Sequence, residues 1–148
     1  MRWLAAAVIT AIALMAPVTA YASPMSPARL GNVALDWAEA HETGHPYVWG
    51  GSGPYGYDCS GAVMAAFAHE GIILPHNTVA MIESGRLVRT WHPRRGDLAF
   101  WGSPYFPEHV EFVTRWWHTT FGAQHSGTVV WWHRWNEWWE PSSFWEIR

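Results

Sequence analysis

The chain has 148 residues with a formal net charge of −3, and 49% of its residues are hydrophobic. This length favours a single domain, and the hydrophobic content suffices for a folded core, which excludes a disordered chain. The nine basic residues form no cluster, so the chain lacks the positive face that binding to nucleic acid requires.

The N-terminal segment has the features of an export signal. Arg2 precedes the apolar stretch Leu4–Ala16, and the small residues of the following AYA sequence stand where a signal peptidase reads them. The apolar stretch is too short to span a bilayer comfortably. We therefore expect residues 1–22 to be a cleaved signal peptide and 23–148 to form one exported domain, with an uncleaved anchor as the alternative.

Helical patterns dominate the first half of this domain. Ser26 can cap a helix that begins at Pro27, and apolar residues then recur with helical spacing until Gly44 ends the pattern. Asp58 can cap a second helix, which is almost entirely apolar and should therefore be buried. A short helical segment is expected over Thr78–Glu83.

Alternating patterns dominate the second half and predict strands. The segments with strand character are RLVRT, LAFWG, HVEFVTR, TTFGA, GTVVWW and the terminal FWEIR. Because the helices precede a run of strands, we predict an α+β domain in which N-terminal helices pack on an antiparallel sheet of about five strands.

The single cysteine lies in the most glycine-rich part of the chain, YVWGGSGPYGYDCSG. Exported proteins use cysteines in disulfide pairs, so a lone thiol is either an inert core residue or a reactive group. Cys59 falls in the first turn of the second predicted helix, where free N–H groups and the helix dipole favour the thiolate. This position favours a cysteine nucleophile over an inert thiol.

A cysteine nucleophile requires a general base, and the chain contains nine histidines. His109 opens a predicted strand, and a histidine at a sheet edge that faces a helix N-terminus has the geometry of a Cys–His pair. We therefore select His109 as the candidate base. His118, His125 and His133 match no standard zinc spacing, so no metal site is predicted.

These residues resemble the NlpC-type cell-wall cysteine peptidases, which have a circularly permuted papain-like core. The resemblance is carried by YVWGGSGPYGYDCSG, then RRGDLAFWG, then HV at the start of a strand, and it covers roughly Pro27 to Arg148. It implies that Cys59 attacks a scissile amide and that His109 acts first as base and then as acid. The implied substrate is the peptidoglycan stem peptide, typically between the γ-carboxyl of D-glutamate and the next diamino acid, and no cofactor is needed.

The resemblance also implies roles for three residues around the nucleophile. Tyr47, Asp58 and Ser60 match positions that in relatives help to bind the free amine of the stem peptide or line the oxyanion site. The backbone N–H of Cys59, at the helix start, is an oxyanion donor in its own right.

The third catalytic position departs from the family pattern. Relatives place a polar residue, often histidine, on the next strand about twelve residues after the base, where it orients the imidazole. In this chain that register falls on Phe121 or Gly122, and neither can orient an imidazole. We select His125 as the third residue, with Gln124, His133 or a water molecule as alternatives.

The C-terminal segment VVWWHRWNEWWEPSSFWEIR contains six tryptophans. No regular spacing places all of them on one side, so several should be exposed and could stack on wall glycan. The sequence thus predicts a secreted, monomeric peptidoglycan endopeptidase in the cell wall or periplasm, with possible glycan contact by this segment. A non-catalytic wall-binding module on the same fold, or an amidase or acyltransferase with the same Cys–His pair, is the alternative.

Overall fold

The structure is a computed structural model that describes residues 24–116 and 118–148. The predicted signal peptide, residues 1–22, lies outside the described residues. Within the described ranges, no helix is both long enough and apolar enough to cross a membrane.

The described part of the chain begins with three helices: α1 (Pro27–His41), α2 (Cys59–His69) and α3 (Thr78–Glu83). Each begins at a polar side chain that accepts a hydrogen bond from the backbone N–H three residues later, and these caps are Ser26, Asp58 and Asn77. The predicted helix starts are confirmed. The predicted burial of α2 is also confirmed, since most of its residues are buried.

Among the described residues, six strands follow and form one antiparallel sheet: β1 (Leu87–Thr90), β2 (Leu98–Gly102), β3 (Pro107–Val113), β4 (Thr119–Gly122), β5 (Trp131–Arg134) and β6 (Ser143–Ile147). Their order is β1-β6-β2-β3-β4-β5, so the C-terminal strand lies inside the sheet. The predicted α+β class is confirmed, with six strands instead of about five. The predicted strand GTVVWW is only partly confirmed. The regular strand begins at Trp131, and Val129 instead forms an isolated bridge with Pro46.

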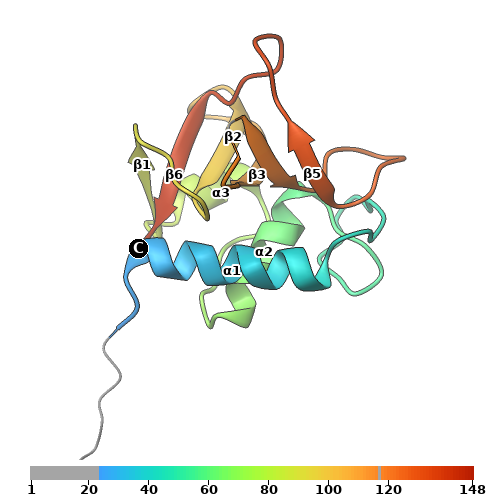
Figure 1. The fold of residues 1–148 in the computed structure, drawn as a ribbon, viewed down its shortest axis with the longest axis horizontal. Helices are drawn as coiled ribbons and strands as arrows, with labels where there is room; N and C mark the ends of the chain where they lie inside the picture. Colours follow the sequence, from blue (N-terminus) through green and yellow to red (C-terminus); the bar gives the residue numbers. More distant parts are fainter. Residues whose placement is uncertain (1–23, 117) are drawn as a thin grey trace, which may run out of the picture.

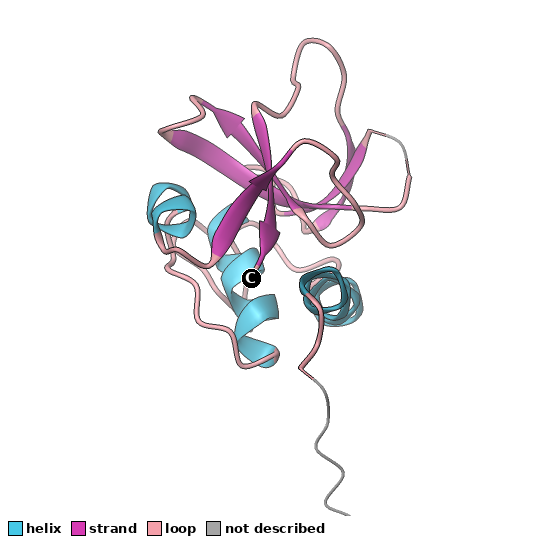
Figure 2. Ribbon diagram, turned by 90° about the vertical axis from the view of Figure 1, so that its left-hand side faces the viewer, coloured by secondary structure: helices cyan, strands magenta, loops and turns pink. Residues whose placement is uncertain are grey.

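The hydrophobic core lies between the helices and one face of the sheet (Figures 1 and 2). Phe67 of α2 packs against Phe112 of β3, with ring centroids 5.5 Å apart. Because side chains alternate along a strand, Glu111 points to the other face of β3 from Phe112. Phe112 therefore faces the core between the sheet and the helices, whereas Glu111 lies on the opposite face of the strand.

Asp58 ties the glycine-rich loop to the start of α2. Its carboxylate accepts hydrogen bonds from the backbone N–H of Gly61 at 2.7 Å and of Gly50 at 2.8 Å. A Cβ added to Gly61 would lie only 1.9 Å from the carbonyl oxygen of Gly51, so the loop backbone rests directly on the helix. The first turn of α2 is thereby held in a fixed position against the loop.

A buried carboxyl group ends α1. Glu42 is 0% exposed, and neither carboxyl oxygen has a hydrogen-bond partner among the described residues. Burial raises the pKa of Glu42 from 4.5 to about 9. The side chain is therefore a neutral acid in the folded protein at neutral pH, whereas it ionises in the unfolded chain.

Replacing this acid should change how stability depends on pH. Since the folded pKa lies above the unfolded value, the contribution of Glu42 is fully present below pH 4.5 and is lost as the pH rises to about 9. The loss amounts to about 1.4 kcal/mol per pH unit. We expect Glu42→Gln to gain in free energy of unfolding relative to wild type between about pH 5 and pH 8, measured by urea denaturation.

The exposed Glu83 provides the matched control, because Glu83→Gln removes a carboxyl that is already hydrated in the folded state. This variant should follow the wild-type pH dependence. A constant difference between Glu42→Gln and wild type across the pH range would contradict a neutral Glu42 in the folded protein.

Gly122 on β4 makes room for a larger side chain on β3. The register pairs Phe112 with Phe121, which places Glu111 across from Gly122. A Cβ on Gly122 would lie 2.8 Å from Cγ of Glu111, closer than two carbon atoms can approach without displacement. The absence of a side chain at this position therefore permits Glu111 to be buried against the sheet.

Adding a methyl group at Gly122 should destabilise the fold. Gly122→Ala overpacks the site next to Glu111, and such changes cost about 1–3 kcal/mol. The same substitution should cost less in a Glu111→Ala background, where the clashing Cγ is gone. Urea denaturation of the four proteins in this double-mutant cycle measures the coupling, and equal costs in both backgrounds would refute it.

Candidate active site

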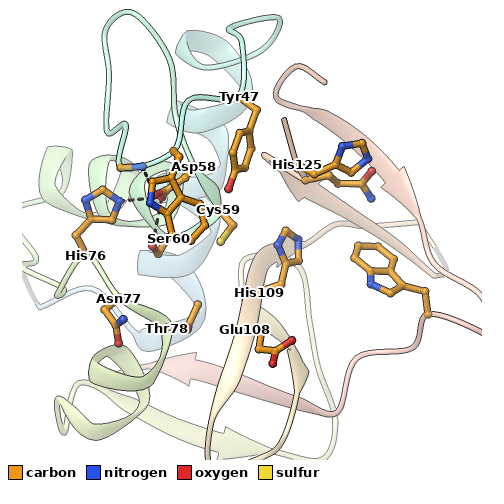
Figure 3. A pocket seen from close by; sticks show the side chains of 14 residues that line it. Tyr47, Asp58, Cys59, Ser60, His76, Asn77, Thr78, Glu108, His109 and His125 are labelled. Carbon is orange, nitrogen blue, oxygen red and sulfur yellow. Dashed lines mark hydrogen bonds and ion pairs between the residues drawn. The ribbon is translucent and has the colours of Figure 1, made fainter. Parts of the chain in front are cut away.

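A cavity of about 780 Å³ opens beside the N-terminus of α2 (Figure 3). Its walls come from the glycine-rich loop, the first turn of α2, the segment that leads into α3, the start of β3, and two later loops. Segments far apart in sequence thus converge on the single cysteine of the chain.

Cys59 and His109 face each other in this cavity. Cys59 is the first residue of α2 and is partly buried, and His109 lies near the start of β3. The thiol is close enough to the imidazole to raise its pKa, and Figure 3 shows the sulfur beside the ring. The structure therefore brings together the two residues that the sequence selected as nucleophile and base.

A buried carboxylate holds the far side of the imidazole. Nε2 of His109 lies 3.0 Å from Oε1 of Glu111, which leaves Nδ1 as the ring nitrogen available to the thiol. Glu111 is 0% exposed, and its Oε2 accepts a hydrogen bond from the Thr120 hydroxyl at 2.5 Å. Nδ1 of His133 lies 3.1 Å from Oε1, close enough for an ion pair but poorly aligned for a hydrogen bond. Within residues 24–116 and 118–148, no group of three or more histidine, cysteine, aspartate or glutamate side chains is arranged to hold a metal ion.

The charges in this group stabilise one another. Burial alone would raise the pKa of Glu111, but its contacts with His109 and His133 outweigh burial and lower it to about 2. Burial also lowers the pKa of His109, but hydrogen bonds to Cys59 and Glu111 raise it to about 9. A protonated His109 is therefore stable between a buried carboxylate and the thiol at neutral pH.

The structure does not place His125 where it would orient His109. Nδ1 of His125 lies 2.9 Å from the carbonyl oxygen of Ser126, and the ring is exposed at the cavity wall. His133, an alternative candidate, contacts Glu111. The side chain that contacts the imidazole on the side away from Cys59 is Glu111, which corrects the prediction for this position.

A signal for Glu111 was present in the sequence. It stands two residues after His109 in a predicted strand, and alternate residues of a strand share one face. The prediction missed it because the third residue was sought on the following strand, where the register position is Phe121. Phe121 is buried in the core, and the carboxylate reaches the imidazole from β3 itself.

Tyr47, Asp58 and Ser60 all line the same cavity. Besides capping α2, the Asp58 carboxylate accepts a hydrogen bond from Ser60 at 3.3 Å and lies 2.8 Å from Nε2 of His76. His76 was not predicted as a site residue. Burial, followed by the charges of Cys59 and Asp58, raises the pKa of Tyr47, so its hydroxyl stays protonated and can donate a hydrogen bond.

The C-terminal tryptophans differ in burial. Trp132 and Trp145 pack against the core. The exposed ones include Trp131, Trp138 and Trp139. Trp139 lines the cavity and stacks on Trp101, with ring centroids 4.5 Å apart. Part of the tryptophan-rich segment thus forms a wall of the site.

A family model described as the NlpC/P60 family matches residues 44–127. A protein of Mycobacterium tuberculosis named a probable endopeptidase is 46% identical over 65 residues, which cover 44% of this chain and 17% of that protein. The bifunctional muramidase/DL-endopeptidase CwlT of Bacillus subtilis is 41% identical over 63 residues, covering 42% of this chain and 19% of CwlT. The matched region thus spans less than a fifth of these curated relatives.

Solved structures share the fold over most of the chain. The NlpC/p60 domain of the peptidoglycan hydrolase SagA superposes with a TM-score of 0.67 at 28% identity, covering 80% of this chain and 97% of that domain. RipD of M. tuberculosis, described as a non-catalytic NlpC/p60 protein adapted to peptidoglycan binding, has a TM-score of 0.62 at 25% identity, covering 80% and 96%. The resemblance found in the sequence is confirmed: the chain belongs to the NlpC/P60 family.

Proposed function

We propose that this protein is an exported cysteine peptidase that hydrolyses a peptide bond in the stem peptide of peptidoglycan. The observation that carries the proposal is that Cys59 and His109 meet in one cavity, with the buried Glu111 behind the imidazole. The names of relatives, which include a DL-endopeptidase and a peptidoglycan hydrolase, support this substrate.

In the proposed reaction, the proton of the Cys59 thiol already resides on Nδ1 of His109, whose pKa is raised to about 9, and the thiolate sulfur attacks the carbonyl carbon of the scissile amide. The backbone N–H of Cys59, at the positive end of α2, stabilises the oxyanion that forms. The imidazolium then protonates the leaving amine, and a thioester remains. Water, activated by His109, hydrolyses the thioester and restores the thiol.

Glu111 takes the orienting role in this mechanism. Its carboxylate holds Nε2 of His109, so the ring keeps the tautomer and the orientation that direct Nδ1 at the thiol. It also stabilises the imidazolium, which persists until the leaving amine is protonated. Thr120 and His133 in turn fix the carboxylate, since each contacts one of its oxygens.

The scissile bond that we propose lies between the γ-carboxyl of D-glutamate and the diamino acid. In this proposal Tyr47, Asp58 and Ser60 hold the part of the stem peptide that precedes the bond, including its free amine. The protein acts as a secreted monomer after removal of residues 1–22, and the exposed tryptophans contact wall glycan.

A second candidate is a non-catalytic peptidoglycan-binding domain, and the description of RipD favours it. The nucleophile and base of this chain are both present and in contact, which supports the catalytic proposal instead. An amidase with the same Cys–His pair would leave the same site geometry, so product analysis must separate it from an endopeptidase.

Cys59→Ala should abolish the release of soluble peptides from purified sacculi, because no other thiol can form the thioester. Mass spectrometry should show released peptides that begin with the diamino acid and a stem that ends in D-glutamate on the remaining glycan, whereas cleavage at the sugar–peptide amide would indicate an amidase. Circular dichroism checks that the variant is folded. Sacculus binding without any peptide release by the wild-type protein would support the binding module.

Glu111→Gln should lower activity and move its pH profile. The amide preserves shape but removes the charge that helps raise the pKa of His109 to about 9. The alkaline limb of kcat/KM should therefore lie near pH 9 in wild type and at lower pH in the variant, with activity reduced roughly 10²–10⁴-fold. A reduced rate with an unchanged limb would indicate a purely structural role for Glu111.

A further inference from the structure

Two carboxylates line the cavity, and only one of them is already engaged. Asp58 accepts hydrogen bonds from Gly50 and Gly61 and contacts His76. Glu108 is exposed at the cavity wall, and no hydrogen bond or ion pair engages its side chain in the described part of the chain. Glu108 is therefore the carboxylate of this cavity that is free to meet a charged group of a ligand.

The cavity offers few partners to a carboxylate group of a ligand. The chain contains no lysine, and no arginine is among the residues that line this cavity. Of its three histidines, His76 and His109 already lie against carboxylates, which leaves His125 at the wall. A ligand ammonium would thus find a partner in Glu108, whereas a ligand carboxylate near Glu108 would meet a like charge.

Glu108 lies on the side of the cavity where we expect the leaving half of the substrate. Figure 3 shows Tyr47 and Glu108 on opposite sides of the Cys59–His109 pair. In the proposed function, Tyr47 belongs to the group that holds the portion preceding the scissile bond. The diamino acid, which departs with the leaving amine, then extends toward the side where Glu108 lies.

We propose that Glu108 selects stem peptides whose diamino acid ends in a free ammonium group with no carboxylate beside it. Lysine, ornithine and amidated diaminopimelate have this chemistry, whereas unmodified diaminopimelate carries an additional negative charge. Cross-linking converts the ammonium to a neutral amide, so the same contact favours stems that are not cross-linked. This inference rests on the proposed function, because that function identifies the leaving residue.

The effect should be modest, because Glu108 is exposed to solvent. Ion pairs in such settings are partly screened, and a preference of roughly two- to fivefold in kcat/KM is expected. The preference should shrink as ionic strength rises, since salt screens exposed charges.

The test compares three synthetic peptides that differ only at the third residue of L-Ala-γ-D-Glu-X, where X is lysine, Nε-acetyl-lysine or meso-diaminopimelate. Wild type should cleave the lysine peptide with the highest kcat/KM. Glu108→Gln should remove the preference for lysine over acetyl-lysine, and Glu108→Arg should favour diaminopimelate. Glu83→Gln removes an exposed carboxylate outside the cavity lining and should keep the wild-type ratios.

The ratio of kcat/KM between two peptides reports on Glu108 even if its substitution disturbs the neighbouring His109, because such a disturbance lowers the rate for all the peptides alike. Identical ratios in wild type, Glu108→Gln and Glu108→Arg would overturn the inference while leaving the proposed peptidase intact. If wild type cleaves none of the peptides, the proposed function fails. The affinity of each peptide for Cys59→Ala, measured by calorimetry, then tests whether Glu108 contacts the ammonium group. Tighter binding of the lysine peptide than of its acetylated form, abolished by Glu108→Gln, would support the contact, and equal affinities would overturn it.

Discussion

The buried carboxylate of Glu111 is the constraint on which the rest of the site depends. A charge that is fully shielded from water is costly unless opposite charges and hydrogen bonds compensate it. His109 and His133 supply the charge contacts and Thr120 the hydrogen bond, so three strands are held around one carboxylate. The same contacts fix the ring that faces Cys59, so the carboxylate of Glu111 both holds the strands together and has the orienting role in the proposed mechanism.

Cys59, the proposed nucleophile, is positioned by a different set of contacts. Asp58 caps α2 and binds the glycine-rich loop, so Cys59 begins a helix whose first turn cannot shift relative to that loop. The helix and the strand of His109 are then joined through the core, where Phe67 packs on Phe112. The distance between thiol and imidazole therefore depends on a hydrophobic contact as well as on the polar groups beside it.

Much of the fold was predictable because its signals are local. The caps at Ser26 and Asp58 and the apolar character of α2 determine helix starts and burial without reference to distant residues. The exact extent of β5 was not predictable, since it depends on Val129 pairing with Pro46 instead of continuing the strand. The buried, unpaired acid at Glu42 likewise carries no sequence signature that separates it from an exposed glutamate.

By itself, the sequence determined the α+β architecture and pointed to Cys59 and His109 as the proposed nucleophile and base, because helix caps, strand alternation and a lone cysteine are properties of short segments. Only the tertiary structure decided which side chain supports the base. Three strands had to be paired in register before Glu111 could be seen between His109, Thr120 and His133, with Gly122 leaving the space it occupies. His125 is near the expected position in the sequence, but contact with the imidazole depends on position in space, which strand pairing determines.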